Sequence, residues 1–459
     1  MRIVVLIISA AAFQMGYAQQ PSGAAKTTFA ARLIFQDHDA RTLKWADVRI
    51  DPAGELSLST VTSVPGFPKL DVDKQKLVQM QGVDGKLLVG VRDEAEGKFG
   101  SGYVLVNTNV RYTDHGDHGH WNAKSTPTVL SSIIDKHQGN PAHVYEYSNR
   151  FYVANDLKNG YTQFEPAKWH SSTTGEVKVD TPRFLPGGGN HITLAVVGNR
   201  VGYSCWIDGS GPNKGRVDVT ALEGPSPSIR YSFQLPSGVI HGATTCANKV
   251  FFAPADGICW VEADTRLSKT SDQVQIKHIS MGKEGDKPNR TGAFSTHEKH
   301  VLCVTGKAKL AKLVLINAQG VEPKPIFLPL HGEVGHKPLT PAIVRVEKKT
   351  ALAFVFHDRD PESKIDDLLD VIALDPDGNR DYADARVVKT LKVGSSAVSG
   401  HYGHHSIAFD ADGRFAYITN PGSGTIAVLD LKSLEFKATF KVSGKPTQLY
   451  VHGGRDHDD

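Results

Sequence analysis

Regularly spaced histidines are the residues of this chain best suited to chemistry. There are 20 His among 459 residues, against an ordinary usage of about 2%. His143, His191 and His241 each begin a similar segment, and the pair His404 and His405 begins a later one. Neutral imidazole is the commonest metal ligand in proteins, and zinc takes three or four such donors in a tetrahedron. The pattern predicts a metal site built from these five side chains. The alternative is a ring of histidines hydrogen-bonded to water.

A second candidate site is the segment DHGDHGHW at residues 114–121. It offers His115, Asp117, His118 and His120 as metal ligands within a few residues of one another. Local His/Asp tracts of this kind are compositional signals of metal binding, and the glycines allow the loop to fold its side chains onto one ion. The alternative is a solvated polar loop.

The elements that position these side chains recur along the chain. A short apolar run, a tight turn and a second apolar run begin at residues 191, 241, 291 and 341, with the register HITLAVVGNRVGYSC, HGATTCANKVFFAPA, TGAFSTHEKHVLCVT and PAIVRVEKKTALAFV. Similar units begin at 76, 143 and 405. The last unit continues into a third and a fourth strand, and four antiparallel strands repeated at this period are typical of an all-β propeller.

The number of blades follows from the units and from the ends of the chain. Besides the seven units, the segment 31–61 has strands for an eighth blade but lacks an inner strand. The spare strand at 446–452 supplies it, so we expect N- and C-terminal strands to pair and close the ring. Eight blades in one domain spanning residues 19–459, with short flexible ends, is the prediction, and seven blades is the alternative.

In this frame the two histidine groups have different places. Inner strands line the channel of a propeller, so His143, His191, His241 and the pair His404–His405 are expected at its mouth. The loop with His115 joins the third and fourth strands of blade two. Such a loop opens on the opposite face, which makes two separate sites unless the loop folds inward.

Composition and the first residues restrict the class of protein. The formal charge of +3 argues against a nucleic-acid binder. Arg2, the apolar run 3–13 and the small residues Gly16 and Ala18 predict a secretory signal peptide over residues 1–18, with a retained membrane anchor as the alternative. No later segment is apolar enough to span a membrane. We therefore expect a periplasmic or secreted protein without membrane insertion.

Enzyme motifs and cysteine motifs are both missing from the sequence. Gly-x-Ser-x-Gly and His-Glu-x-x-His do not occur, so neither a hydrolase nucleophile nor a zinc-protease helix is predicted, and we expect no catalytic residue. Cys205, Cys246, Cys259 and Cys303 lie far apart in apolar runs. In an oxidising compartment they predict one or two disulfides or small buried hydrophobic side chains.

Three stretches resemble the AztD-type family of periplasmic zinc metallochaperones. They are TDHGDHGH (113–120), PAHVYEYSNRFYV (141–153) and IHGATTCANKVFFAPADGICWVE (240–262). The family has a similar D-H-G-D-H-G loop, a P-S-H strand start and an H-G-x-x-x-x-G strand followed by a D-G-V turn, in this order. The resemblance implies a propeller that binds Zn²⁺, with His118, His143 and His241 as the matched ligand positions.

The resemblance also implies a function. It is that of an exported zinc-binding protein that hands zinc to the periplasmic substrate-binding protein of an ABC importer. This chain departs from the family at 19–28, where a mobile His/Asp-rich segment is expected and no histidine occurs; the C-terminal HGGRDHDD is the alternative donor. Two other functions remain open, a metal-dependent propeller enzyme of the lactonase or quinoprotein-dehydrogenase type and a metal-free interaction scaffold.

Overall fold

The structure is a computed structural model, and it describes the chain from residue 27 onward. The described residues are 27–459 apart from 117, 172–176, 225, 347–349, 397–402 and 456–459. The signal peptide expected at 1–18 and the candidate ligand Asp117 therefore lie outside the described residues.

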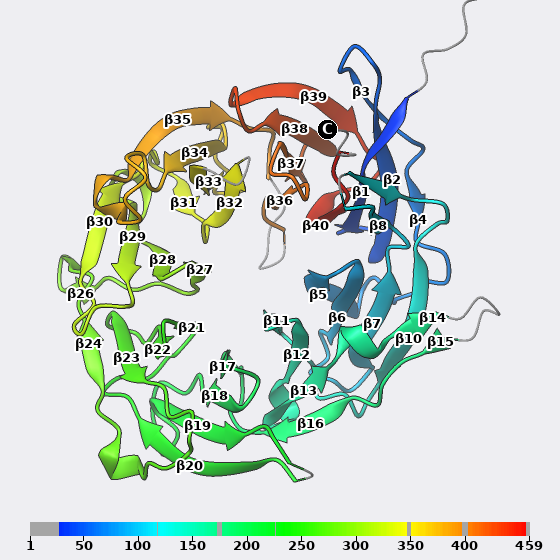
Figure 1. Ribbon diagram of the computed structural model, residues 1–459. Coiled ribbons are helices and arrows are strands. Elements are labelled where there is room, and N and C mark those ends of the chain that lie inside the picture. The colour runs from blue at the N-terminus through cyan, green and yellow to red at the C-terminus, as the bar shows by residue number, and fades with distance from the viewer. Residues whose placement is uncertain are drawn as a thin grey trace, which may run out of the picture.

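The described residues form eight sheets of four or five strands, arranged as the blades of a ring (Figure 1). Neighbouring strands of a blade pair antiparallel, and the first strands of the repeat lie nearest the axis in blades 2 to 8, whereas the inner strand of blade 1 comes from the C-terminal end of the chain. The all-β propeller predicted from the sequence is confirmed, with eight blades rather than seven.

Blades 1 to 4 carry the first half of the ring. Their strands are, for blade 1, β1 (Thr28–Asp37), β2 (Thr42–Ile50), β3 (Leu56–Leu58), β4 (Thr62–Ser63) and β40 (Pro446–His452); for blade 2, β5 (Gln75–Val83), β6 (Lys86–Asp93), β7 (Ser101–Asn107) and β10 (Thr128–Asp135); for blade 3, β11 (Val144–Tyr147), β12 (Arg150–Asn155), β13 (Gly160–Phe164) and β16 (Arg183–Pro186); and for blade 4, β17 (Leu194–Val197), β18 (Val201–Cys205), β19 (Arg216–Ala221) and β20 (Ser228–Gln234).

Blades 5 to 8 form the second half of the ring. Their strands are, for blade 5, β21 (Ala243–Cys246), β22 (Lys249–Phe252), β23 (Ile258–Glu262) and β24 (Lys277–Ile279); for blade 6, β27 (Ser295–His297), β28 (His300–Thr305), β29 (Lys312–Asn317) and β30 (Pro325–Pro329); for blade 7, β31 (His336–Pro338), β32 (Ala342–Val346), β33 (Thr350–Arg359), β34 (Leu368–Ala373) and β35 (Arg386–Lys392); and for blade 8, β36 (Ile407–Phe409), β37 (Phe415–Asn420), β38 (Thr425–Asp430) and β39 (Glu435–Lys441).

Smaller elements lie in the connections between the strands of the blades. They are the two-stranded ribbons β8 (Arg111–Asp114) with β9 (Gly119–Asn122), β14 (His170–Ser171) with β15 (Val177–Lys178), and β25 (Lys283–Glu284) with β26 (Lys287–Pro288), and the 3₁₀ turns η1 (Asp156–Lys158), η2 (Pro166–Lys168), η3 (Ser271–Gln273), η4 (Ala308–Leu310) and η5 (Tyr382–Asp384). Among the described residues, no helix has the length and apolar character needed to cross a bilayer.

The hydrophobic core lies between the blades. Eight clusters of buried residues were found among the described residues, and each joins two neighbouring blades. Side chains alternate between the two faces of a strand. Phe251 thus packs toward blade 6, while Phe252 packs toward blade 4. This explains why the second strands read as continuous apolar runs, since both of their faces are buried.

The ends of the chain close the ring. Strand β40 pairs antiparallel with β1, with Arg32 opposite His452 and Ile34 opposite Tyr450. Leu33 and Leu449 of blade 1 share a buried cluster with Phe415 of blade 8. The predicted closure by terminal strands is therefore confirmed, because β40 pairs with the inner edge of β1.

Two faces of the ring are distinguished by the direction of the inner strands. The histidine face, where the inner strands begin, carries His143, His191 and His241 just before β11, β17 and β21. The hairpin face, where they end, carries His452 at the end of β40 and, packed on its ring, Trp121 of the β8–β9 hairpin.

Candidate metal centre

Three histidines from consecutive blades meet on the histidine face. His143, His191 and His241 each offer one ring nitrogen, and these atoms all lie within 4.8 Å of one another. The Nε2 atoms of His143 and His191 are 2.9 Å apart. The three side chains meet because each occupies the same position ahead of the inner strand of its own blade. We call them the channel triad.

Neighbouring groups set the orientation of two of these rings. The Nδ1–H of His241 donates to the carbonyl oxygen of Gly292 at 3.1 Å, which puts the lone pair of the neutral ring on Nε2. The Nδ1 of His191 faces the Oδ2 of Asp156 at 3.5 Å. Such partners behind a histidine fix its tautomer and raise its basicity toward a metal. Burial lowers the pKa of His241, so this ring stays neutral to a lower pH than an exposed histidine.

Asp156 lies beside the channel triad, and the sequence pattern did not single it out. It begins η1, after β12, and its side chain is almost fully buried. Its Oδ1 accepts the backbone N–H of Ile192 at 3.0 Å, and its Oδ2 accepts from Arg92 at 3.2 Å. The carboxylate is thus fixed beside His191 by groups from two blades. Nothing in its local sequence, NDLKNG, distinguishes it from other turn aspartates.

Two members of the channel triad border a cavity of about 450 Å³. His143 and His241 line one part of it, and His404 and His405 of blade 8 line another. The polar side chains of Gln79, Gln81 and Gln448 also face this space. The predicted channel histidines of blades 3, 5 and 8 therefore line one shared chamber.

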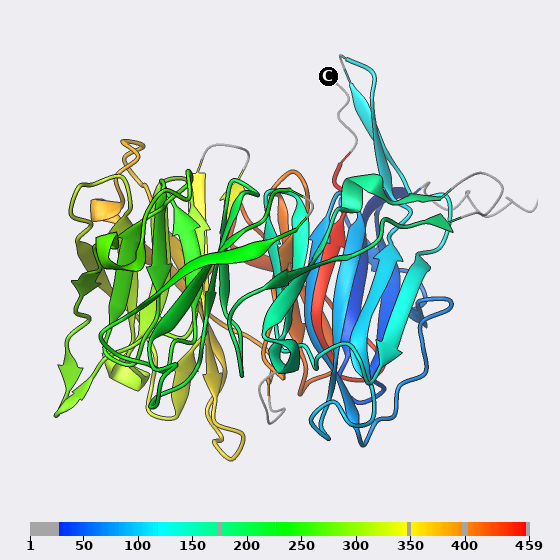
Figure 2. The ribbon, with the colours of Figure 1, turned by 90° about the horizontal axis from the view of Figure 1, so that it is seen from below.

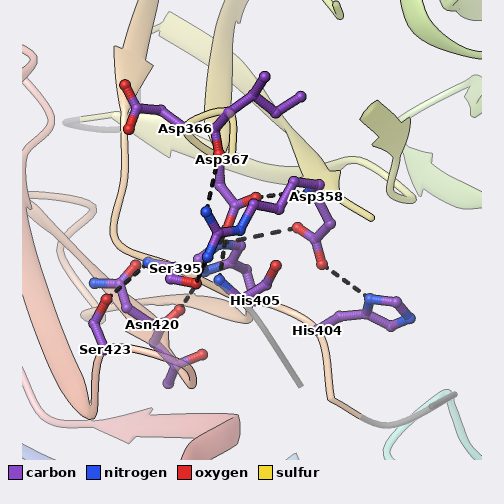
Figure 3. Close-up of polar contacts among 12 residues, drawn as sticks. Asp358, Asp366, Asp367, Ser395, His404, His405, Asn420 and Ser423 are labelled. Carbon is purple, nitrogen blue, oxygen red and sulfur yellow. Dashed lines mark hydrogen bonds and ion pairs between the residues drawn. The ribbon is translucent and has the colours of Figure 1, made fainter. Parts of the chain in front are cut away.

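His404 and His405 are held by buried carboxylates (Figure 3). The Nδ1 of His404 lies 2.9 Å from Asp358, so Nε2 is the nitrogen of His404 that a metal would take. His405 is fully buried; its Nδ1–H donates to the carbonyl of Thr419 at 2.6 Å, and its Nε2 lies 3.3 Å from Asp367.

The two histidines of this pair therefore differ in character. Burial by itself lowers the pKa of His405, but Asp367, Asp358 and the Thr419 carbonyl outweigh it and the pKa is raised. The pKa of Asp367 falls to about 2 because its hydrogen bonds outweigh burial. With both ring nitrogens of His405 engaged, the geometry favours a buried ion pair at His405. His404 is the member of the pair that remains open to the chamber, and metal binding by either stays a prediction.

The histidine loop of blade 2 is a β-hairpin. It joins β7 to β10, the third and fourth strands of the blade, as the sequence predicted. His115, His118 and His120 each offer a ring nitrogen, again all within 4.8 Å of one another. The structure therefore brings the candidate ligands together in two groups, and His118 is not in the same group as His143 and His241.

Two histidines near blade 7, His331 and His357, hydrogen-bond to a buried carboxylate. The buried carboxylate of Asp370 accepts from His357 on β33 at 3.0 Å, Thr390 on β35 at 2.6 Å and the backbone N–H of His331 at 2.8 Å. This carboxylate thus ties the second and fourth strands to the connection from the preceding blade.

Asp218 of blade 4 repeats the arrangement with other residue types. It accepts from Trp206 at 2.8 Å, Ser232 at 2.6 Å and the backbone of Gly188 at 2.9 Å. Burial raises the pKa of Asp218 by itself, but these bonds and Arg216 outweigh it and the pKa is lowered. The buried carboxylate of Asp218 makes the same kind of hydrogen bonds without any histidine partner. The His357–Asp370 contact is therefore explained as a link between strands of one blade.

The four cysteines are free and buried. Burial raises the thiol pKa of Cys205 and Cys259 to about 12. The interpretation as small buried hydrophobic side chains is confirmed, and the predicted disulfides are absent from the described residues.

Comparison with known proteins identifies relatives by fold alone. No protein-family model matches the chain, and no curated protein matches it. The crystal structure of AztD from Citrobacter koseri matches with a TM-score of 0.60 at 14% identity, over 94% of this chain and 100% of that chain. Apo AztD from the same species gives 0.58 at 14% identity, over 93% and 99%.

A redox enzyme has a similar fold. Dihydro-heme d1 dehydrogenase NirN in complex with DHE matches with a TM-score of 0.52 at 12% identity, over 94% of this chain and 77% of that chain. At these identities the matches show a shared fold. The resemblance to AztD that three sequence motifs predict therefore extends to the architecture of the whole propeller.

Proposed function

We propose that this chain is an exported zinc-binding protein that takes Zn²⁺ at the channel triad and passes it to the substrate-binding protein of an ABC importer. The observation that carries the proposal is the convergence of three imidazoles, with ring nitrogens within 4.8 Å of one another, at equivalent positions of three blades. The AztD-type motifs and the AztD-like fold support zinc as the metal and the periplasm as the location.

The donor set suits zinc. Zinc ligands lie about 2.0–2.1 Å from the ion, which places tetrahedral donors about 3.3 Å apart. The 2.9 Å between Nε2 of His143 and Nε2 of His191 is close to this spacing, so small ring rotations suffice. Three protein nitrogens leave a fourth position for water or an incoming ligand, and His404 on the same chamber is the candidate fourth donor.

Transfer from such a site proceeds by exchange of ligands. An acceptor protein that supplies one imidazole or carboxylate at the open position can displace the triad histidines one at a time. The ion then never passes through bulk water. Access is from the histidine face, because the triad lies at the start of the inner strands.

The test is metal analysis of the purified protein after dialysis, followed by competition with a chromophoric chelator. We expect zinc at the channel to be retained and to move to the purified substrate-binding protein without appearing in solution. Absence of stoichiometric zinc, or the same zinc content in a His143→Ala/His191→Ala/His241→Ala variant, would overturn the proposal. Turnover of lactones with added divalent metal would favour the enzyme alternative.

A further inference from the structure

The chamber beside the channel triad is larger than a metal site needs. Its volume is about 450 Å³, whereas a single water that completes a zinc site needs only about 15 Å³. Small-molecule sites in proteins span about 300–1,000 Å³. One end of the chamber lies on the histidine face, where His143 and His241 border it. The β8–β9 hairpin stands out from the opposite face (Figure 2), so it does not cover this end.

One side of the chamber is apolar and built from small residues. The inner strand of blade 3 presents the bulky Tyr145 to the chamber, whereas blades 5 and 6 present Ala243 and Ala293 at the corresponding positions. Phe294 and Leu339 line the chamber beside these alanines. This side therefore offers an apolar surface, and the space above it, to the side chain of a ligand.

The other side carries three glutamine amides. The Oε1 of Gln79 accepts the backbone N–H of Val144 at 3.1 Å, which leaves both hydrogens on its Nε2 for a ligand. The Nε2 of Gln81 donates to the carbonyl of Val144 at 3.4 Å, which leaves its Oε1 as an acceptor. Within the described part of the chain, the side-chain amide of Gln448 has no hydrogen-bond partner. Donors and an acceptor thus face the same space, as recognition of a carboxylate next to an amine or hydroxyl requires.

The charge of the chamber restricts what can enter it. The described residues that line it include no Lys, Arg, Asp or Glu, and the buried carboxylate of Asp358 lies behind His404. Burying a carboxylate is costly unless a positive charge compensates it. Zn²⁺ on the channel triad supplies such a charge. A ligand carboxylate therefore needs the metal in order to bind, and a second carboxylate on the ligand finds no further compensation.

We propose that the chamber binds, together with Zn²⁺, a small monocarboxylate that has an amine or hydroxyl on its α-carbon and an apolar side chain. This inference rests on the proposed function, because it needs zinc on the channel triad. The carboxylate and the α-donor complete the coordination of the metal, and the amides of Gln79 and Gln448 hold the carboxylate. The apolar side chain packs beside Ala293. The protein thus takes up zinc as a complex with a free amino acid or hydroxy acid.

Equilibrium dialysis of the full-length protein, loaded with Zn²⁺ or stripped of it, measures metal and ligand together. The radiolabelled probes are L-leucine and (S)-2-hydroxy-4-methylpentanoate, which share one carbon skeleton, and the one retained more tightly identifies the α-donor. We expect retention only with Zn²⁺, and none in a His143→Ala/His191→Ala/His241→Ala variant. Unlabelled 4-methylpentanoate, which lacks the α-donor, and L-aspartate, which has a second carboxylate, should compete at least about 10-fold less well.

Two variants test the walls of the chamber. Gln448→Met removes an amide without breaking a hydrogen bond inside the described protein, and Ala293→Leu fills the apolar side. Each should weaken retention of the probe at least about 10-fold while zinc bound without the probe is unchanged. Gln319→Met, at an exposed turn, is the matched control and should behave as the wild type. Because coupling between two ligands is reciprocal, saturating probe should lower the Kd for zinc by the factor by which zinc tightens the probe.

The outcomes separate this inference from the proposed function. Zinc bound through the triad with neither probe retained would overturn the inference and leave the proposed function standing. Equal retention with and without zinc, or unchanged retention in both wall variants, would also overturn it. Absence of zinc from the triad would overturn both.

Discussion

The Nε2 atoms of His143 and His191 lie 2.9 Å apart, although 48 residues separate them in the chain. Each nitrogen stands just ahead of the inner strand of its own blade, and the blades are neighbours. At this distance one shared proton or one metal ion must lie between the two lone pairs. His241 from the next blade brings a third ring nitrogen within 4.8 Å of these two, so the three nitrogens could hold a metal ion.

Removing one triad histidine should weaken zinc binding severely. His191→Ala leaves two imidazoles, which is a poor donor set for zinc, so we expect the dissociation constant to rise at least about 100-fold. Competition titration with a chelator, in a His115→Ala/His118→Ala/His120→Ala background, measures the channel ion alone. The control is His137→Ala, which removes an exposed histidine; an equal loss there would show that the effect is not specific.

Removing the carboxylate behind His191 should have a smaller effect. Asp156→Asn keeps an acceptor for the backbone of Ile192 but removes the charge that faces Nδ1 of His191. Loss of such a partner behind a ligand typically costs 10- to 100-fold in metal affinity. The thermal unfolding midpoint of the metal-free Asp156→Asn variant shows whether a lower metal affinity comes from misfolding instead. Asp180→Asn, at a partly exposed position, should leave the metal affinity unchanged. An unaltered affinity in Asp156→Asn would exclude a role for the Asp156 carboxylate.

The buried carboxylate of Asp218 in blade 4 should contribute to folding stability and not to metal affinity. Asp218→Ala leaves the indole N–H of Trp206, the hydroxyl of Ser232 and a backbone N–H without their acceptor. Because each buried unsatisfied donor costs about 1–3 kcal/mol, we expect a loss of about 3 kcal/mol in unfolding free energy. Urea denaturation measures it, with exposed Asp73→Ala as the matched control. A loss of less than about 0.5 kcal/mol, which is the usual range for surface substitutions, would contradict the assigned role.

Acid sensitivity should depend on a buried histidine away from both sites. His300 packs on Tyr382 with centroids 3.8 Å apart, and burial lowers its pKa to about 4. The unfolded chain, with a pKa of about 6.5, binds a proton first as the pH falls. His300 therefore makes stability decrease between pH 6.5 and about 4, by about 2 kcal/mol at pH 5.

The variant His300→Phe tests this assignment. We expect it to keep stability near pH 7.5 and to lose less on acidification to pH 5, because no group at this position takes up a proton. Urea denaturation of the metal-free protein at both pH values makes the comparison. The exposed variant His137→Ala serves as the control. An identical pH dependence in His300→Phe and wild type would show that His300 does not carry the acid response.

Much of the fold could be predicted because it depends on local pattern. Short apolar runs separated by turns recur every 50 residues, and this period predicts blades; the segment 31–61 without an inner strand, together with the spare strand 446–452, predicts the closure. The register of the β8–β9 hairpin could also have been predicted from the sequence, because two strands around a Gly-containing turn put His115, His118 and His120 on one face. The position of this hairpin could not be predicted, because it depends on hydrogen bonds from Arg32 of another blade.

By itself, then, the sequence determined the propeller, its eight blades and the recurrence of histidine at the start of successive inner strands, because these are properties of neighbouring residues. Only the tertiary structure decided which histidines share a site. Proximity of side chains across blades depends on the closed ring, which brings His143 to His191 and separates both from His118. It also depends on partners distant in sequence: Asp156 faces Nδ1 of His191, and Asp367 engages His405 in a buried ion pair.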